Sequence, residues 1–198
     1  MLNIWWKKMQ NKKVEAFIEP PKKIPLFLKI GIAISKKVTK KDLLVPKLLS
    51  WYPKVAISSA ILETMVAHGK DDLNKRILKI VRIQASLSVS CPFCIDMNSS
   101  EYEGDDITKQ ELNCLIGKLN IDDVLTFTIK EKLAMEYTKL ISQTPIKIPK
   151  EFMEKLKLSF TEREIVIISS TAAQVNYWAR LIQALGVPPA GFSNKCEI

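Results

Sequence analysis

Two cysteines separated by two residues, Cys91 and Cys94, are the residues whose type and spacing best suit chemistry. They follow a long apolar helical pattern and stand at the predicted start of another helix. A thiol at a helix N-terminus ionises more readily, because the helix dipole favours negative charge there. On a helix both sulfurs would share one face and could form a disulfide. This spacing predicts a redox-active pair.

Two other interpretations of the pair have to be weighed. A zinc site needs four ligands, usually a second Cys-x-x-Cys or two histidines. The chain has a single histidine, His68, and the remaining cysteines, Cys114 and Cys196, stand apart. Two unreactive core cysteines remain open as an alternative. We expect a redox pair with no metal and no cofactor, a core thiol at Cys114 and a mobile tail thiol at Cys196.

The start of the chain does not resemble a secretory signal, because Trp5 and Trp6 precede the first charges and no small-residue cleavage site follows. The longest mostly apolar run, 24–34, has 11 residues and contains Lys29, which is too short to span a bilayer. We therefore expect a cytoplasmic protein. Thiols are kept reduced there, so a Cys-x-x-Cys is more often catalytic or metal-binding than structural.

The positive charge is confined to the N-terminal region. Residues 1–50 contain 12 lysines and 3 acidic residues, which accounts for the whole net charge of +9. Such a region could attract an anionic membrane surface, a nucleic acid or an acidic partner. Its lysines are scattered and it has no arginine, so an ordinary soluble surface is the favoured interpretation and no nucleic-acid partner is expected. A membrane surface stays open as a partner of this basic arm.

Hydrophobic periodicity predicts an all-α fold, with a basic arm over 1–23 and a single helical domain over 24–198. Thr-x-x-Glu capping boxes at Thr108, Thr128 and Thr161 start three of the helices. Gly186 is expected to end the helix that Thr161 starts, and Gly69 the helix over 54–68. Helices are predicted over 24–38, 42–50 (with an interruption at Pro46), 54–68, 72–90, 92–102, 108–117, 128–140, 149–158 and 161–185.

Three stretches together resemble the carboxymuconolactone decarboxylase / alkylhydroperoxidase D-like family. They are the helix before the cysteines (76–87), the Cys91-Pro92-Phe93-Cys94 pair and the tail 173–189 with its Asn-Tyr-Trp-x-Arg motif. The resemblance covers roughly residues 54–193. It implies an all-α fold and a homo-oligomer. It also implies that Cys94 attacks peroxide and that Cys91 resolves the oxidised product.

The sequence departs from the family pattern at two positions of the expected proton relay. Asn98 stands where the pattern has a histidine four residues after the second cysteine, and Lys79 stands where it has a glutamate twelve residues before the first. An amide cannot accept and release a proton at neutral pH, although it can hydrogen-bond a thiolate. Lys79 would lower a thiol pKa if it pointed at the site; a solvated surface lysine is the alternative. Asp96 and Glu101 are the nearest carboxylates in sequence.

The sequence therefore predicts a thiol-dependent peroxidase or disulfide oxidoreductase. Its site residues would be Cys94, Cys91, Asn98 and Lys79, its substrate a peroxide or disulfide, and its reductant a dithiol protein. Dithiol–disulfide exchange needs only the two sulfurs and some thiolate. Two alternatives remain: a non-catalytic redox sensor or binding module that has lost the relay, and a decarboxylase-like lyase acting on a lactone acid.

Overall fold

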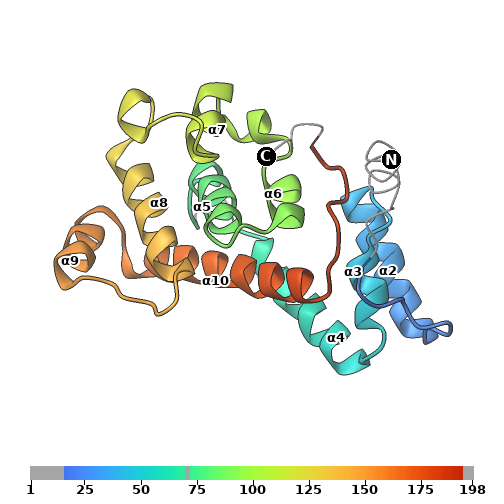
Figure 1. Ribbon diagram of the computed structural model, residues 1–198. Helices are drawn as coiled ribbons and strands as arrows, with labels where there is room; N and C mark the ends of the chain where they lie inside the picture. The colour runs from blue at the N-terminus through green and yellow to red at the C-terminus, as the bar shows by residue number, and fades with distance from the viewer. Residues whose placement is uncertain (1–15, 70–71, 194–198) are drawn as a thin grey trace, which may run out of the picture.

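Helix α5, Lys75–Ser88, lies at the centre of the fold and delivers the chain to the cysteine pair. In the computed structural model, which describes residues 16–69 and 72–193, α5 contacts α6, α7, α8 and α10 (Figure 1). Ile80, Val81 and Ile83 on this helix are fully buried. A helix that is apolar on most of its faces has to be surrounded by others. Its burial fixes the position of the pair that follows.

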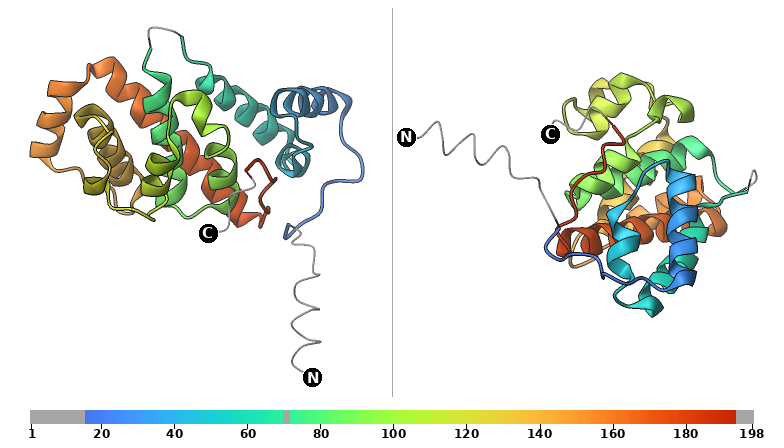
Figure 2. Two further views of the ribbon diagram at one scale, coloured as in Figure 1. Left: turned by 90° about the horizontal axis from the view of Figure 1, so that it is seen from above. Right: turned by 90° about the vertical axis from the view of Figure 1, so that its right-hand side faces the viewer.

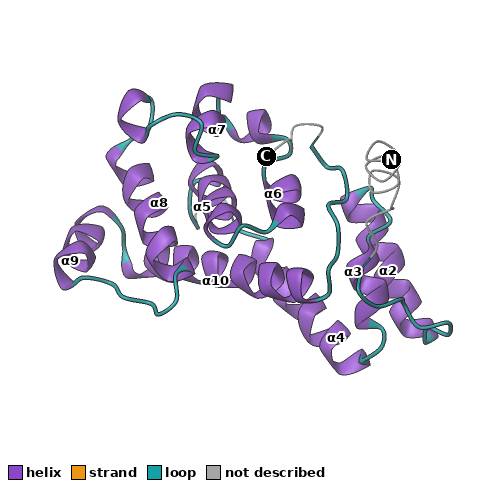
Figure 3. Cartoon of the chain, in the orientation of Figure 1, coloured by secondary structure: helices purple, strands orange, loops and turns teal. Residues whose placement is uncertain are grey.

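The described residues form helices and loops without a strand, which confirms the all-α prediction (Figure 3). Short 3-10 turns cover Glu63–Val66, Tyr102–Asp105 and Ile121–Asp123. The other α-helices are α2 Leu26–Thr39, α3 Leu44–Leu49, α4 Pro53–Leu62, α6 Pro92–Asn98, α7 Lys109–Leu115, α8 Ile129–Ser142, α9 Lys150–Ser159 and α10 Glu162–Ala184.

The long helix α10 runs along one side of α5, α6 and α8 (Figure 1). Its predicted capping box is present, since the side chain of Thr161 accepts the N–H of Glu164 and that carboxylate accepts the N–H of Thr161. The chain leaves the helix at Gly186, where φ is 66° and the ring of Phe17 packs so closely that a β-carbon would clash. The predicted helix end at Gly186 is therefore confirmed.

Arg76, in the first turn of α5, joins two of the capping boxes. Its Nη2 donates to Glu111 at 2.5 Å, and its Nε donates to Glu131 at 2.6 Å. Each carboxylate also accepts the backbone N–H of the threonine that starts its own helix, Thr108 or Thr128. The side chains of Glu111 and Glu131 are only 1% and 7% exposed, so Arg76 neutralises two nearly buried charges and holds α5, α7 and α8 together.

Helices α2, α3 and α4 form a group at one end of the molecule (Figure 2). The predicted stripe on α2 keeps its helical spacing, but Phe27, Ile30 and Ile34 are each more than half exposed. Leu28, on another face, is the buried residue of this helix. Helix α2 therefore contacts α3 and α4 through a narrow face around Leu28. No described part of the chain covers its apolar stripe.

Several helix ends differ from the predictions. The helix expected over 54–68 stops at Leu62 and continues only as a 3-10 turn, so His68 is not in a last helical turn. Gly69 does not act as a left-handed cap; its N–H instead donates to Asp72 at 2.6 Å. The helix expected to reach 102 ends at Asn98, because Glu101 adopts a left-handed conformation that an α-helix cannot continue through.

Pro46 lies in the first turn of α3, where its missing N–H is not needed, and does not interrupt the helix. Of the predicted arm, residues 16–23 are described and carry no helix. The N–H of Phe17 donates to Leu185 at 2.9 Å, and Trp51 Nε1 donates to the carbonyl of Glu19 at 2.8 Å. Trp5, Trp6 and Cys196 lie outside the described residues. Within the described ranges no helix combines the length and apolarity needed to cross a membrane.

Candidate functional site

A tight turn between α5 and α6 holds the cysteine pair. Ser90 takes the left-handed conformation, with φ of 50°, and the N–H of Cys91 returns to the carbonyl of Ser86 at 3.2 Å. Cys91 is the residue that caps α6, and Pro92 occupies the first helical position, where proline is favoured. The Cys91 sulfur accepts the backbone N–H of Cys94 at 3.3 Å. One of the two thiols thus serves as the helix cap.

The two sulfur atoms lie 2.7 Å apart and both thiols are free. Cys91 is 0% exposed and Cys94 2% exposed. The sulfurs are therefore placed to form a disulfide without movement of the backbone. Cys114 packs in a different part of the core, among residues of α7 and α8, and burial raises the pKa of its thiol. It cannot exchange with the pair in this structure.

The two thiols of the pair differ in pKa. The hydrogen bond with Cys94 lowers the pKa of Cys91, and backbone N–H groups lower it further. Burial acts in the opposite direction but does not outweigh them. The hydrogen bond with Cys91 and burial raise the pKa of Cys94 above its ordinary value. The start of the helix therefore favours a thiolate at Cys91 and not at Cys94. The reason is that only the capping sulfur receives the free N–H groups of the helix.

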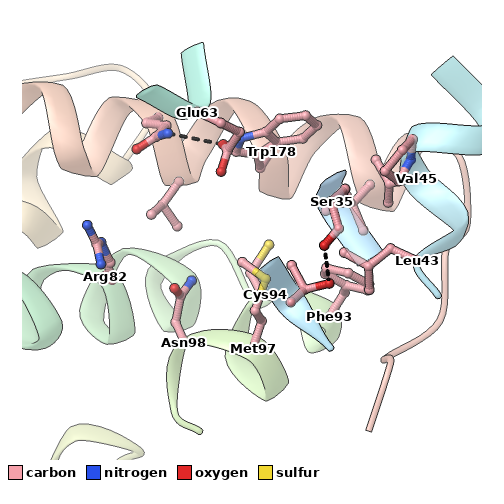
Figure 4. Close-up of a pocket in the computed structure, with 15 residues that line it drawn as sticks. Ser35, Leu43, Val45, Glu63, Arg82, Phe93, Cys94, Met97, Asn98 and Trp178 are labelled. Atoms are coloured by element: carbon pink, nitrogen blue, oxygen red, sulfur yellow. Dashed lines mark hydrogen bonds between the residues drawn. The ribbon is translucent and has the colours of Figure 1, made fainter. Parts of the chain in front are cut away.

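A cavity of about 160 Å³ opens beside Cys94. Figure 4 shows that α5 and α6 form one side of it and α10 the opposite side, while α2 and α3 lie at one end. Cys94 lines the cavity, whereas Cys91 does not. Most of the wall is apolar, with side chains of Leu43, Val45, Phe93, Met97, Val175 and Trp178. Of the two cysteines, Cys94 is therefore the one that a small molecule in this cavity can contact.

Asn98 lies one turn after Cys94 and lines the same cavity (Figure 4). Its Nδ2 donates to Ser86 Oγ at 2.9 Å, and that hydroxyl donates to the carbonyl of Arg82 at 2.7 Å. The amide is therefore held between α6 and α5 in a fixed orientation. It can orient a ligand but cannot take the proton that the family histidine would carry.

Lys79 is neither beside the cysteines nor a solvated surface lysine, so both interpretations of it are wrong. Its Nζ donates to the carbonyl of Ser100 at 2.6 Å and lies 3.7 Å from Asp105, with 13% of the side chain exposed. Burial lowers the pKa of this ammonium. Lys79 stabilises the turn that follows α6, and it is absent from the cavity wall. The fourth residue expected in the site, Lys79, therefore has a structural role.

The two carboxylates nearest in sequence also lie elsewhere. Asp96 is 1% exposed and accepts the backbone N–H groups of Phe192, at 3.0 Å, and Ser193, at 2.7 Å. It ties the C-terminal segment to α6. Glu101 lies on the turn after α6 and is exposed. Neither residue lines the cavity, so neither replaces the missing relay.

Two charged residues of the cavity, Arg82 and Glu63, were not predicted from the sequence. Burial lowers the pKa of Arg82, and its Nε is buried without a hydrogen-bond partner in the part of the chain that the structure describes. Glu63 accepts hydrogen bonds from Gln174, at 3.1 Å, and from Trp178 (Figure 4). The presence of an arginine among the buried apolar positions of α5 could have indicated that Arg82 belongs to a site. No sequence pattern indicated Glu63, which lies at an exposed helix end, as a site residue.

No family model matches the chain. The uncharacterized protein YdfG of Bacillus subtilis is 26% identical over 140 residues, which are 70% of this chain and 93% of that protein. An uncharacterized peroxidase-related protein from Silicibacter superposes with a TM-score of 0.75 at 15% identity, covering 90% of this chain and 93% of its own.

Two further structures share the fold. The alkylhydroperoxidase AhpD core protein from Ralstonia eutropha has a TM-score of 0.71 at 13% identity, over 88% of this chain and 92% of its own. The debrominase Bmp8, solved with 2,3,4-tribromopyrrole, has a TM-score of 0.71 at 12% identity, over 86% of this chain and 91% of its own. The chain therefore has the alkylhydroperoxidase D-like fold, which confirms the resemblance at the level of fold and shows that this fold also supports other activities.

Proposed function

We propose that the protein is a thiol oxidoreductase that reduces hydroperoxides through Cys94 and Cys91. The observation that carries the proposal is the pair of free sulfurs 2.7 Å apart, of which only Cys94 lines the cavity. The fold it shares with a peroxidase-related protein is consistent with this chemistry. The debrominase neighbour means that the fold alone does not decide the substrate.

In the first step Cys94 attacks the terminal oxygen of a hydroperoxide in the cavity. The O–O bond breaks, Cys94 becomes a sulfenic acid, and the alkoxide takes up the proton that Cys94 released and leaves as the alcohol. The attacking sulfur has to be a thiolate. The Cys91 sulfur, 2.7 Å away, is the group in reach to accept the proton of Cys94 and pass it to the alkoxide. Because the pKa of Cys91 is lowered and that of Cys94 is raised, this transfer is energetically uphill and adds to the barrier. Cys91 would thus replace the missing histidine as the local base.

In the second step Cys91 attacks the sulfenic sulfur of Cys94. The Cys91 thiolate forms the S–S bond, the S–O bond breaks, and the hydroxide is protonated by the solvent and leaves as water. A dithiol protein then reduces the disulfide by exchange and is itself oxidised. Without the relay residues we expect turnover to be slow, since general acid–base assistance contributes about 10²- to 10⁴-fold.

Treatment with cumene hydroperoxide is expected to remove two of the four maleimide-reactive thiols, counted after denaturation. Dithiothreitol should restore both, because the product is a disulfide between Cys91 and Cys94. Peptide mapping identifies the bridged residues, with Cys114 as the internal control for a buried thiol. Unchanged thiols would contradict both the peroxidase and the sensor hypotheses, and reversible oxidation without catalytic turnover would support the sensor.

The lyase alternative receives no support from the cavity, because Glu63 is the one carboxylate among the lining residues and its hydrogen bonds come from Gln174 and Trp178, so no second acid–base group is paired with it. The homo-oligomer, the dithiol reductant, the membrane surface and the cytoplasmic location stay predictions from the sequence.

A further inference from the structure

We propose that the cavity beside Cys94 binds an amphiphilic organic anion, whose carboxylate pairs with Arg82 and whose apolar body lies along α6, α10 and α3. The claim that this anion carries the reacting hydroperoxide rests on the function proposed above. The binding claim stands on the cavity alone.

The guanidinium of Arg82 is the first reason. It lies at the end of the cavity opposite α2 and α3, next to Asn98 (Figure 4). Its Nε is buried without a hydrogen-bond partner, and no carboxylate of the described residues forms an ion pair with it. The negative charges of Asp105 and Glu63 act on this guanidinium only from beyond ion-pair distance, and an anionic ligand in the cavity would supply a direct partner. The planar fork of an arginine suits a carboxylate in particular.

The shape of the cavity is the second reason. Past Cys94 the wall becomes apolar, with Phe93, Leu43, Val45 and Ile182 toward α3. A cavity of about 150 Å³ is large enough for a benzene-sized molecule, and this one measures about 160 Å³. The ligand therefore has one charged end and one apolar end. Cys94 lies between them, so the reacting group belongs in the middle of the molecule or on its apolar part.

Glu63 is the charged group that opposes such a ligand. Its carboxylate faces the cavity from the side of α10, where Gln174 and Trp178 donate to it, and it is not within ion-pair distance of Arg82. The two hydrogen bonds hold the carboxylate of Glu63 close to α10 and away from Arg82. Replacing Glu63 by glutamine should therefore strengthen the binding of an anion.

The test compares two probes of the same shape, 4-isopropylbenzoate and neutral 4-isopropylbenzamide, by calorimetric titration of the reduced full-length protein. We expect the acid to bind about 10- to 100-fold more tightly than the amide, the range for hydrogen bonds to a charged group. Arg82→Gln should abolish this preference, Arg82→Lys should keep part of it, and Glu63→Gln should increase it. Arg180→Gln is the matched control, because Arg180 is exposed and donates to Thr144 outside the cavity.

Equal binding of acid and amide to the unmodified protein, or a preference that survives Arg82→Gln, would overturn the proposal. So would the absence of binding of both probes. Arg82→Lys and Glu63→Gln keep the test decisive if Arg82→Gln does not fold. Because binding is measured without turnover, its failure is distinguishable from failure of the peroxidase proposal. Turnover of 4-carboxycumene hydroperoxide against cumene hydroperoxide then shows whether the bound anion is a substrate.

Discussion

Cys94→Ser is expected to abolish hydroperoxide turnover, lowering kcat/KM by about 10³-fold or more, as loss of a nucleophile does in other enzymes. Cys94 is the one thiol of the described residues that lines the cavity, so peroxide bound there has no other thiol to react with. Serine keeps the shape of the side chain but is a far weaker nucleophile at neutral pH. The measurement is consumption of cumene hydroperoxide with dithiothreitol as reductant.

Cys114→Ser is the matched control, since Cys114 is also a buried thiol but packs away from the cavity. Its turnover should equal that of the unmodified protein. Cys91→Ser should still reduce one equivalent of peroxide, more slowly because the local base is lost. It should lose multiple turnover with a reductant that acts only on the disulfide, because no thiol of the protein then resolves the sulfenic acid. If Cys94→Ser keeps its turnover, Cys94 is not the attacking residue.

Arg76→Leu is expected to lower the free energy of unfolding by about 3–5 kcal/mol, the usual cost of removing one partner of a buried ion pair. The reason is that Glu111 and Glu131 would keep buried charges without a counter-ion. Urea denaturation followed by circular dichroism measures the change. Arg163→Leu is the control, because Arg163 is 65% exposed in its ion pair with Asp72 and should cost less than about 1 kcal/mol.

The difference between the unmodified protein and Arg76→Leu should also depend on pH. Although burial alone would raise it, hydrogen bonds from Arg76, Thr108 and Thr126 lower the pKa of Glu111 to about 2. An acid with a lowered pKa stabilises the folded state above its unfolded pKa of about 4.3 and loses that contribution as the pH falls through the folded value. The difference should be complete at pH 7 and shrink between about pH 4 and pH 2. A difference independent of pH would contradict this role of the pair.

Local patterns in the sequence were sufficient for most of the fold. The three Thr-x-x-Glu boxes were all predicted, because a cap involves residues only three positions apart. The convergence of two of their glutamates on Arg76 could not be predicted, since it depends on how α5, α7 and α8 pack. The same limit explains the error at Gly69, whose N–H is bound by a nearby side chain instead of ending a helix.

In the candidate site, too, the features set by local spacing could be predicted, and those set by the packing of distant segments could not. The closeness of the two sulfurs and the position of Asn98 one turn after Cys94 follow from spacing on one short helix, and Cys94 and Asn98 both line the cavity. Lys79 was placed by analogy with a family position, but its direction depends on the turn at Ser100. Arg82 and Glu63 come from different segments and meet only through packing. Which sulfur carries the thiolate also required the structure, because it depends on which one accepts the N–H groups of α6.

The order of events at the pair is the central claim, and trapping of a sulfenic acid tests it most directly. In Cys91→Ser, one equivalent of cumene hydroperoxide should oxidise Cys94 to a sulfenic acid that no second thiol can resolve. Dimedone added afterwards should label Cys94, as located by tandem mass spectrometry of the peptide, and Cys94→Ser should carry no dimedone on Cys91. Labelling of Cys91 in Cys94→Ser, or no label at Cys94 in Cys91→Ser, would contradict the proposed order.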